Sequence, residues 1–412
     1  MAASPDNLIV GLDVGSSKIA MIAAERDADG NLSYVNGSYR LSYGVHNGIV
    51  VDIADAAACI EGALSDLEER VGRRITTACV AVAGPHVQGH RTRGTMAPMG
   101  RDITDEDVAR AIGDARAALA LPENREIIHE IPRAYIVDGQ PGVHDPHGMA
   151  GYELEVEVAY ATGVSTTISN LAKCTSQARL TPDMLVAAPL AAAEAVRPRD
   201  ERMGCVAVVD LGAETLSLAI YADGAVWSSA VLPVGGADIT RDIASQLKLP
   251  WPAAEDLKLR YGQCAPGADE YELVEMPASS GFEGFVPRAA LTAIIRKRGE
   301  ALAQSVAQQL HAVRDAGLDP ETLILTGGGA DLLGLDDLLV RACEVPVSRG
   351  VPRGIRGLPS GLERPIFATA AGLVHWYAHY APYGDGAASG RRFAPLPGFV
   401  AGMKKLFRVV LP

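Results

Sequence analysis

The apolar positions near the start of the chain are interrupted once by a short polar group. Residues 8–14 (LIVGLDV) are apolar or glycine except for Asp13, and residues 18–25 are rich in Ile, Ala and Met. Two apolar runs of this length around a glycine favour a strand, a tight turn and a second strand. The pattern therefore predicts a hairpin that turns at Gly15.

The tip of this hairpin carries the residue types of a phosphate-binding turn. Gly15 lets the backbone approach an anion, and Ser16, Ser17 and Lys18 add hydroxyl and ammonium donors. Asp13 suits such a site if it holds a hydrated Mg²⁺, which binds through few carboxylates. An ordinary hairpin with a polar tip fits these residues equally well. Neither a G-x-x-x-x-G-K-[ST] loop nor a G-x-G-x-x-G turn leading into a helix is present.

The same pattern recurs in the second half of the chain. Residues 206–220 (VAVVDLGAETLSLAI) place Asp210 at the end of an apolar run, followed by Gly212, Thr215 and another strand-like segment. A single hairpin of this kind carries little information. Two of them predict a duplicated fold whose halves face each other across a cleft.

A third segment, residues 323–339 (LILTGGGADLLGLDDLL), has the pattern of a strand, three glycines and a helix. Gly327, Gly328 and Gly329 would let a nucleotide lie flat against the backbone. Three glycines alone are more often a loop than a ligand site.

Two further stretches predict the elements between the hairpins. Residues 44–84 have the pattern of a short strand, a helix with apolar positions at Ile60, Leu64, Leu67 and Val71, and a buried strand. In residues 85–163, Thr104 is the expected N-cap of a helix with acids in its first turn. Strand-like segments at 126–139 and 153–163 then surround a Gly-, Pro- and His-rich loop at 139–151. We expect a small α+β unit here.

The last residues combine a linker with an amphipathic pattern. Residues 383–397 are rich in Gly, Ala and Ser, and residues 398–412 repeat apolar side chains at helical spacing beside basic ones. The apolar stripe and its basic neighbours are Phe399, Met403, Leu406, Phe407 and Val410 with Lys404, Lys405 and Arg408. As a helix the segment is about 20 Å long, short of a hydrocarbon core of roughly 30 Å. We expect it to lie in a membrane interface, with docking on the protein's own core as the alternative.

Composition narrows the choice of partners. The chain has 412 residues, enough for two or more cores, and a net charge of -13. This acidic balance lacks the basic excess that a phosphate backbone requires, so nucleic acid is not an expected partner. Its 6 cysteines have no C-x-x-C spacing and are expected to be reduced. The first residues lack a targeting pattern, and no apolar run approaches the length of a membrane span.

Taken in order, the two aspartate hairpins and the glycine turn resemble the actin/Hsp70/sugar-kinase superfamily. Residues 44–84, the unit at 85–163 and the amphipathic end further resemble the FtsA family of bacterial cell-division proteins. The resemblance implies an α/β, actin-like (ribonuclease H-like) two-domain ATPase fold with an inserted α+β subdomain and a C-terminal amphipathic helix. It also implies ATP and Mg²⁺ as cofactors, with Asp13 and Asp210 flanking the metal.

The resemblance assigns the remaining site residues. Gly15, Ser16, Ser17 and Lys18 would hold one side of the phosphates, Gly212 and Thr215 the other side, and Gly327, Gly328 and Gly329 the adenosine. Glu255 and Lys258, three residues apart on one predicted helical face, would lie near the ribose and base. A solvated ion pair is their alternative role.

The resemblance also implies domain boundaries. The first domain would comprise 1–84 and 164–204, with 362–382 returning to it, and the insert would comprise 85–163. The second domain would comprise 205–250 and 321–361, with an outer subdomain at 251–320 and the linker and tail at 383–397 and 398–412.

Expected partners are the tail of FtsZ, other copies of the chain, anionic lipid of the inner leaflet and later proteins of septum assembly. By the resemblance, Arg298, in a basic cluster of a long helix, is the expected contact for the FtsZ tail. By itself such a cluster is more often a solvated helix face. The expected location is the cytoplasmic face of the inner membrane at the division site. An actin-fold small-molecule kinase and an actin-like protein of pilus assembly are the alternatives.

Two departures from the family pattern matter for function. The second phosphate turn of the family commonly has three small residues before its Thr, but here Glu214 occupies the last of these positions. Its side chain must point away, meet the metal or weaken nucleotide binding. The turn before the connecting helix has Ala187, Ala188 and Pro189, without a side chain that could orient water, and Glu194 is the only nearby acid. No catalytic residue is therefore assigned, and we expect ATP to be hydrolysed slowly or not at all.

Overall fold

The computed structural model describes residues 7–198, 204–265, 272–277, 279, 281 and 284–381. The predicted linker and amphipathic tail lie outside the described residues, so both remain predictions. Within these ranges no helix is both long and apolar enough to cross a bilayer.

The first domain is built on a six-stranded sheet with the order β11-β6-β1-β2-β3-β19. Its strands are β1 (Leu8–Val14), β2 (Lys18–Arg26), β3 (Leu32–Leu41), β6 (Thr77–Val82), β11 (Thr181–Ala187) and β19 (Ile355–Arg356). A small hairpin, β4 (Val45–His46) and β5 (Ile49–Val50), follows β3. Helices α1 (Ile53–Val71) and α3 (Ser165–Gln177) cover one face. The predicted hairpin is confirmed, and α1 buries Ile60, Leu64 and Leu67 as expected.

The second domain repeats this sheet. Its strands have the order β18-β17-β12-β13-β14. Strand β12 pairs antiparallel with β13 and parallel with β17. In the first sheet, β1 pairs in the same way with β2 and β6. The strands are β12 (Cys205–Leu211), β13 (Leu216–Ala222), β14 (Ala225–Leu232), β17 (Thr322–Thr326) and β18 (Val347–Arg349). The helices are α5 (Gly236–Leu247), α6 (Trp251–Tyr261), α7 (Arg288–Asp315) and α8 (Leu335–Cys343), and a small hairpin is formed by β15 (Leu273–Glu275) and β16 (Phe285–Pro287). The second predicted hairpin is also confirmed.

Two helices of small residues separate the sheets. Helices α4 (Ala188–Val196) and α9 (Ala368–Tyr380) cross so closely that a Cβ at Gly372 would lie 1.6 Å from the Ala191 carbonyl oxygen. Val206 and Val208 of β12 pack with these helices, whereas the alternate residues Ala207 and Val209 face the second core. Burial on both faces explains why β12 is apolar from Cys205 to Val209.

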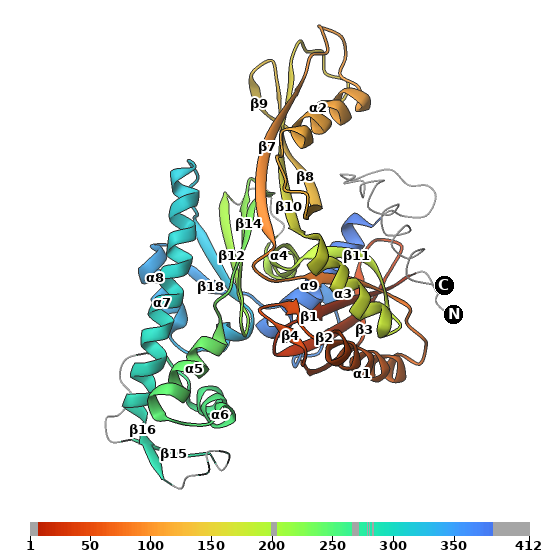
Figure 1. Ribbon diagram of the computed structural model, residues 1–412. Coiled ribbons are helices and arrows are strands. Elements are labelled where there is room, and N and C mark those ends of the chain that lie inside the picture. Colours follow the sequence, from red (N-terminus) through yellow and green to blue (C-terminus); the bar gives the residue numbers. More distant parts are fainter. Residues whose placement is uncertain are drawn as a thin grey trace.

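The inserted unit extends the second sheet, although it is connected in sequence to the first domain. Strands β7 (Gln88–Met96), β10 (Leu154–Val164), β8 (Arg125–Val137) and β9 (Gln140–Val143) continue beyond β14, through the pair Ala230 and Gln88. They rise above both domains with α2 (Asp105–Ala117) on one side (Figure 1). The segment 139–151 was expected to be a loop, and β9 corrects this: it pairs with β8 despite its Gly and Pro content. Residues 355–356 likewise pair with β3, so the chain returns to the first sheet before residue 362.

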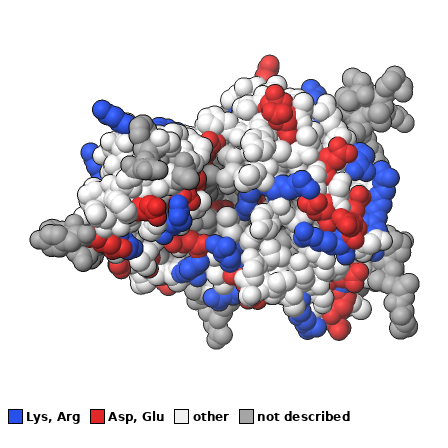
Figure 2. All heavy atoms as spheres, turned by 90° about the horizontal axis from the view of Figure 1, so that it is seen from below, with Lys and Arg blue, Asp and Glu red and all other residues white. Residues whose placement is uncertain are grey.

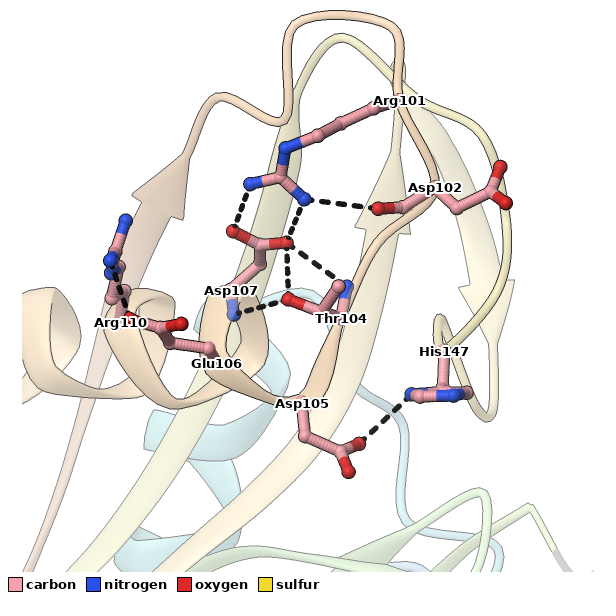
Figure 3. A network of polar contacts seen from close by, with 8 residues as sticks. All are labelled: Arg101, Asp102, Thr104, Asp105, Glu106, Asp107, Arg110 and His147. Atoms are coloured by element: carbon pink, nitrogen blue, oxygen red, sulfur yellow. Dashed lines mark hydrogen bonds and ion pairs between the residues drawn. The ribbon is translucent and has the colours of Figure 1, made fainter.

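A polar network fixes the start of α2 (Figure 3). Thr104 is the N-cap, as predicted, and it exchanges hydrogen bonds with Asp107. Arg101 donates to both carboxylate oxygens of Asp107 at 2.5 and 2.6 Å. These bonds hold the pKa of the Asp107 carboxyl well below its usual range. His147 lies 3.0 Å from Asp105 and ties the segment after β9 to the same helix end.

Candidate nucleotide-binding cleft

The first hairpin presents a neutralised carboxylate. The Gly15 N–H donates to the Lys18 carbonyl at 3.0 Å and closes the turn, and Ser17 accepts from Ser42 at 3.1 Å. The Lys18 ammonium lies 3.1 Å from Asp13, and the two side chains are only 14% and 13% exposed. This ion pair is therefore largely shielded from water.

The second hairpin repeats the turn but not the ion pair. The Gly212 N–H donates to the Thr215 carbonyl at 2.8 Å, which is the same turn bond. Asp210 accepts the Thr369 hydroxyl at 2.9 Å. Desolvation raises the pKa of Asp210 to about 6; the charge of Asp13 adds to this rise, and Thr369 and Lys18 oppose it. Asp13, Lys18 and Asp210 thus interact electrostatically across the two domains.

The glycine turn packs directly against the second hairpin. Gly327 has a φ of +80°, and a Cβ there would lie 2.2 Å from Asp210 Oδ1. A Cβ at Gly329 would lie 2.3 Å from Leu211. At Gly328 a Cβ would meet only the Ile366 side chain, at 3.6 Å, which is an ordinary van der Waals distance. Close approach to β12 therefore accounts for Gly327 and Gly329.

The predicted helical pair also joins this region. Lys258 lies 2.7 Å from Glu255, as the ion-pair alternative requires, but the Lys258 side chain is only 14% exposed. It also donates to the Gly236 carbonyl at 3.1 Å and to Thr240 at 2.9 Å, and thereby links α6 to α5. The Gly236 N–H in turn donates to the Gly212 carbonyl at 3.0 Å. The pair is therefore connected to the second phosphate turn through Lys258, whereas the Glu255 side chain is 35% exposed.

Glu214 points away from both aspartates. One carboxylate oxygen lies 3.0 Å from His46 Nδ1, and the other accepts the Asn47 N–H at 2.6 Å. Of the roles open to it, the structure therefore favours a contact with the first domain. The Gly48 N–H donates to the Ser16 hydroxyl at 2.9 Å, so the same turn also contacts the first phosphate loop.

The turn before α4 has no polar side chain that could orient water, as its residues Ala187, Ala188 and Pro189 indicated. Ala188 and Pro189 are buried, and buried Glu194 lies 3.4 Å from Arg197. His129 is nearby, but its Nε2 accepts the Ala187 N–H at 3.0 Å, and burial lowers the pKa of His129 to about 3. This neutral histidine is held as part of the structure.

Sequence reasoning missed four contact residues. The sequence offered only a weak indication of Thr369 and Thr240. Each is a threonine in a helix that lies beside a glycine-rich turn. His46 and Asn47 carried a clearer one, because Asn47 and Gly48 form the Asn-Gly pair that favours a tight hairpin. Among the described residues, no cluster of three or more His, Cys, Asp or Glu side chains forms a ready metal site.

Arg298 is placed in the second domain as expected but is already paired. Its guanidinium donates to both oxygens of Asp242 in α5 at 2.7 and 2.9 Å, and these bonds raise the pKa of Arg298. About a third of the side chain remains exposed. Basic and acidic side chains are interspersed on the face seen from below (Figure 2).

The two matching sheets, the central helices and the convergent hairpins define the actin-like α/β class of protein. Solved structures share this fold. A chain of the PilM-PilN type IV pilus biogenesis complex matches with a TM-score of 0.66 and 21% sequence identity. The match covers 89% of this chain and 97% of that chain. For MreB5 of Spiroplasma citri bound to ADP, the TM-score is 0.53 and the identity 11%, over 90% of this chain and 96% of the other.

Within that class, the chain belongs to the FtsA family of cell division proteins. The family profile "Cell division protein FtsA" matches residues 207–372, and "SHS2 domain inserted in FTSA" matches residues 84–162. FtsA of Pseudomonas aeruginosa is 33% identical over 370 residues, covering 89% of this chain and 88% of the relative. FtsA of Escherichia coli K12 is 30% identical over 384 residues, covering 91% of each. The resemblance and the actin-like fold with its insert are thus confirmed.

Proposed function

We propose that this cell division protein binds Mg²⁺-ATP between its two hairpins and tethers the FtsZ ring to the cytoplasmic face of the cell membrane at the division site. The observation that carries the nucleotide part is the meeting of Asp13, Lys18 and Asp210, from two domains, in one electrostatic neighbourhood. The family supports the cell division role.

The residues in the cleft fit the proposed cofactors. Two carboxylates, Asp13 and Asp210, match the few protein ligands of a hydrated Mg²⁺. The Lys18 ammonium and the backbone of the two glycine turns suit phosphate oxygens, and the turn at Gly327, Gly328 and Gly329 is the proposed support for the adenosine. When bound, Mg²⁺-ATP supplies charges that bridge the two domains. MreB5, which shares the fold, has been solved with ADP bound.

Hydrolysis is proposed to be slow or absent. The start of α4 has Ala188 and Pro189, and Glu194 is engaged by Arg197. Without a side chain to orient water, general-base assistance of about 10²- to 10⁴-fold is missing. Nucleotide would then act as a conformational clamp. The same lack argues against the small-molecule kinase alternative.

Membrane attachment is assigned to residues 398–412. Their apolar stripe would enter the interface, and each cation near an anionic leaflet adds about 1 kcal/mol. Many such helices on a self-associated assembly would bind tightly through multivalency. The insert would contact later division proteins, and Arg298 the FtsZ tail.

Vesicle sedimentation tests the tether. With vesicles containing anionic lipid, the full chain should pellet, whereas a chain without residues 398–412 and the Phe407→Glu variant should stay in the supernatant. If the shortened chain pellets equally well, the membrane assignment is wrong.

Binding of an FtsZ tail peptide tests Arg298. Arg298→Ala should weaken it by about tenfold, because a charge-assisted hydrogen bond is lost. Asp242→Asn is the matched control, since it disrupts the same ion pair and leaves the guanidinium. Equal losses in both variants would assign Arg298 a purely structural role.

The pilus-assembly alternative rests on a shared fold. The PilM-PilN similarity is at 21% identity, whereas FtsA relatives reach 33% and the FtsA profiles match both the insert and the second domain. The cell division role is therefore favoured.

A further inference from the structure

The Glu214 side chain spans the two domains. It leaves the tip of the β12–β13 hairpin, and both carboxylate oxygens reach the turn between β4 and β5 in the first domain. Both oxygens are thus directed to the first domain's β4–β5 hairpin. A carboxylate that accepts a backbone N–H forms a charge-assisted bond, which is stronger than a neutral one.

The turn that receives Glu214 is held rigidly. Asn47 and Gly48 have φ values of 49° and 72°, so two successive residues are left-handed and the Asn47 N–H points out of the turn. A Cβ at Gly48 would lie 2.9 Å from the Gly84 nitrogen, and a Cβ at Gly84 would lie 2.9 Å from the Asn47 carbonyl oxygen. The turn is thus pressed against the root of the insert and cannot easily follow Glu214 if the domains separate.

The contact lies at the phosphate end of the cleft. The Gly48 N–H donates to the Ser16 hydroxyl, and Glu214 precedes Thr215 of the second phosphate turn. A cavity of about 240 Å³, lined among others by Pro233 and Arg241, adjoins Glu214, and the Glu214 side chain is 22% exposed. Water can therefore reach the bonds and compete for them, so they can break and re-form.

We propose that Glu214 is an interdomain latch: its bonds to His46 and Asn47 hold the cleft closed at the phosphate end and must break before nucleotide leaves. The gating of nucleotide rests on the proposed ATP binding, whereas the latch itself does not.

Two measurements on the full chain test the latch. The first is amide hydrogen exchange over residues 44–50 in the nucleotide-free protein, and the second is the release rate of a fluorescent ADP analogue chased with ATP. Glu214→Ala should speed both by about tenfold, the effect of losing a charge-assisted hydrogen bond. Glu214→Gln keeps an acceptor for the Asn47 N–H and should give a smaller increase, as should His46→Ala.

Exposed Glu123 provides the control, and Glu123→Gln should leave both rates unchanged. Unchanged exchange over residues 44–50 in Glu214→Ala would overturn the latch. Faster exchange with an unchanged release rate would retain the latch and overturn its gating of nucleotide. If no nucleotide binds to the parent chain, the proposed function fails, and hydrogen exchange still decides whether the latch exists. Glu214→Gln preserves side-chain size, so it keeps the test valid if the Ala variant misfolds.

Discussion

The two phosphate hairpins share a backbone and differ in electrostatics. Each closes with the same N–H to carbonyl bond, from Gly15 to Lys18 and from Gly212 to Thr215. In the first hairpin the aspartate is paired with a lysine. In the second, Asp210 accepts the Thr369 hydroxyl and feels the Lys18 charge, but its pKa is still raised to about 6. The duplicated fold therefore presents one carboxylate in an ion pair and one whose pKa is raised.

This difference indicates that the two aspartates have different roles in the cleft. A desolvated carboxylate is costly, and functional sites commonly keep such a cost because a ligand offsets it. Asp210 is the group that a divalent cation would stabilise most. The side chains at the tips diverge as well, since Ser16 accepts a bond from its own domain whereas Glu214 crosses to the other one.

The largest expected effect comes from substituting Asp210, and the melting temperature should distinguish this variant from the one at Asp13. Asp210→Asn should weaken Mg²⁺-ATP binding by about 100-fold or more, measured by calorimetry, because a carboxylate ligand is lost. It should also raise the melting temperature of the nucleotide-free protein, since a desolvated charge is removed.

Asp13→Asn, by contrast, should lower that temperature, because it leaves the shielded Lys18 ammonium unpaired at a cost of about 1–2 kcal/mol. Asp29→Asn, an exposed site, is the control. A loss of stability in both the Asp210 and Asp13 variants would contradict the asymmetry.

Gly327→Ala tests the packing of the glycine turn against the second hairpin. The new Cβ would meet Asp210 Oδ1 in a left-handed backbone, so we expect a loss of about 2–3 kcal/mol in the free energy of unfolding, measured with denaturant. Gly328→Ala is the matched control and should cost about 0.5 kcal/mol or less, since its Cβ would meet only Ile366, at an ordinary van der Waals distance. Similar losses at both positions would show that the turn does not pack as described.

The pH dependence of the free energy of unfolding should reveal the raised pKa of Asp210 directly. Its folded pKa of about 6 lies above the ordinary 3.8, so the folded protein binds a proton that the unfolded chain releases in that interval. The free energy of unfolding of the parent chain, relative to Asp210→Asn, should therefore rise by on the order of 2 kcal/mol as the pH falls from 7 to about 4. Mg²⁺-ATP affinity should fall over the same interval. A flat difference between the two proteins would refute the raised pKa.

Thr369→Val should give the smallest effect. It removes the hydroxyl that donates to Asp210, and this bond lowers the Asp210 pKa. The pH at which Mg²⁺-ATP affinity falls should therefore move upward, by an amount equivalent to about 1 kcal/mol. The size-matched Thr326→Val is the control, because its hydroxyl contacts the Gly350 and Pro365 carbonyls instead. An unmoved midpoint would show that Thr369 does not tune Asp210.

The sequence predicted both hairpins, the glycine turn and the helical unit of the insert, because each depends on local periodicity and turn chemistry. It could not predict β9, since Gly and Pro disfavour strands and only pairing with β8 overrides them. It also left open whether Glu255 and Lys258 were a surface pair, because their link to α5 through Thr240 joins separate elements.

By itself, the amino-acid sequence determined the repeated strand–turn–strand pattern, the capped helices and the choice of residues at each turn, because neighbours along the chain control these features. Only the tertiary structure decided that Asp210 lies beside Asp13 and Gly327, that Glu214 reaches Asn47, and that the insert extends the second sheet. These contacts depend on how two sheets pack around α4 and α9, and that packing sets the burial and charge environment that no local pattern contains.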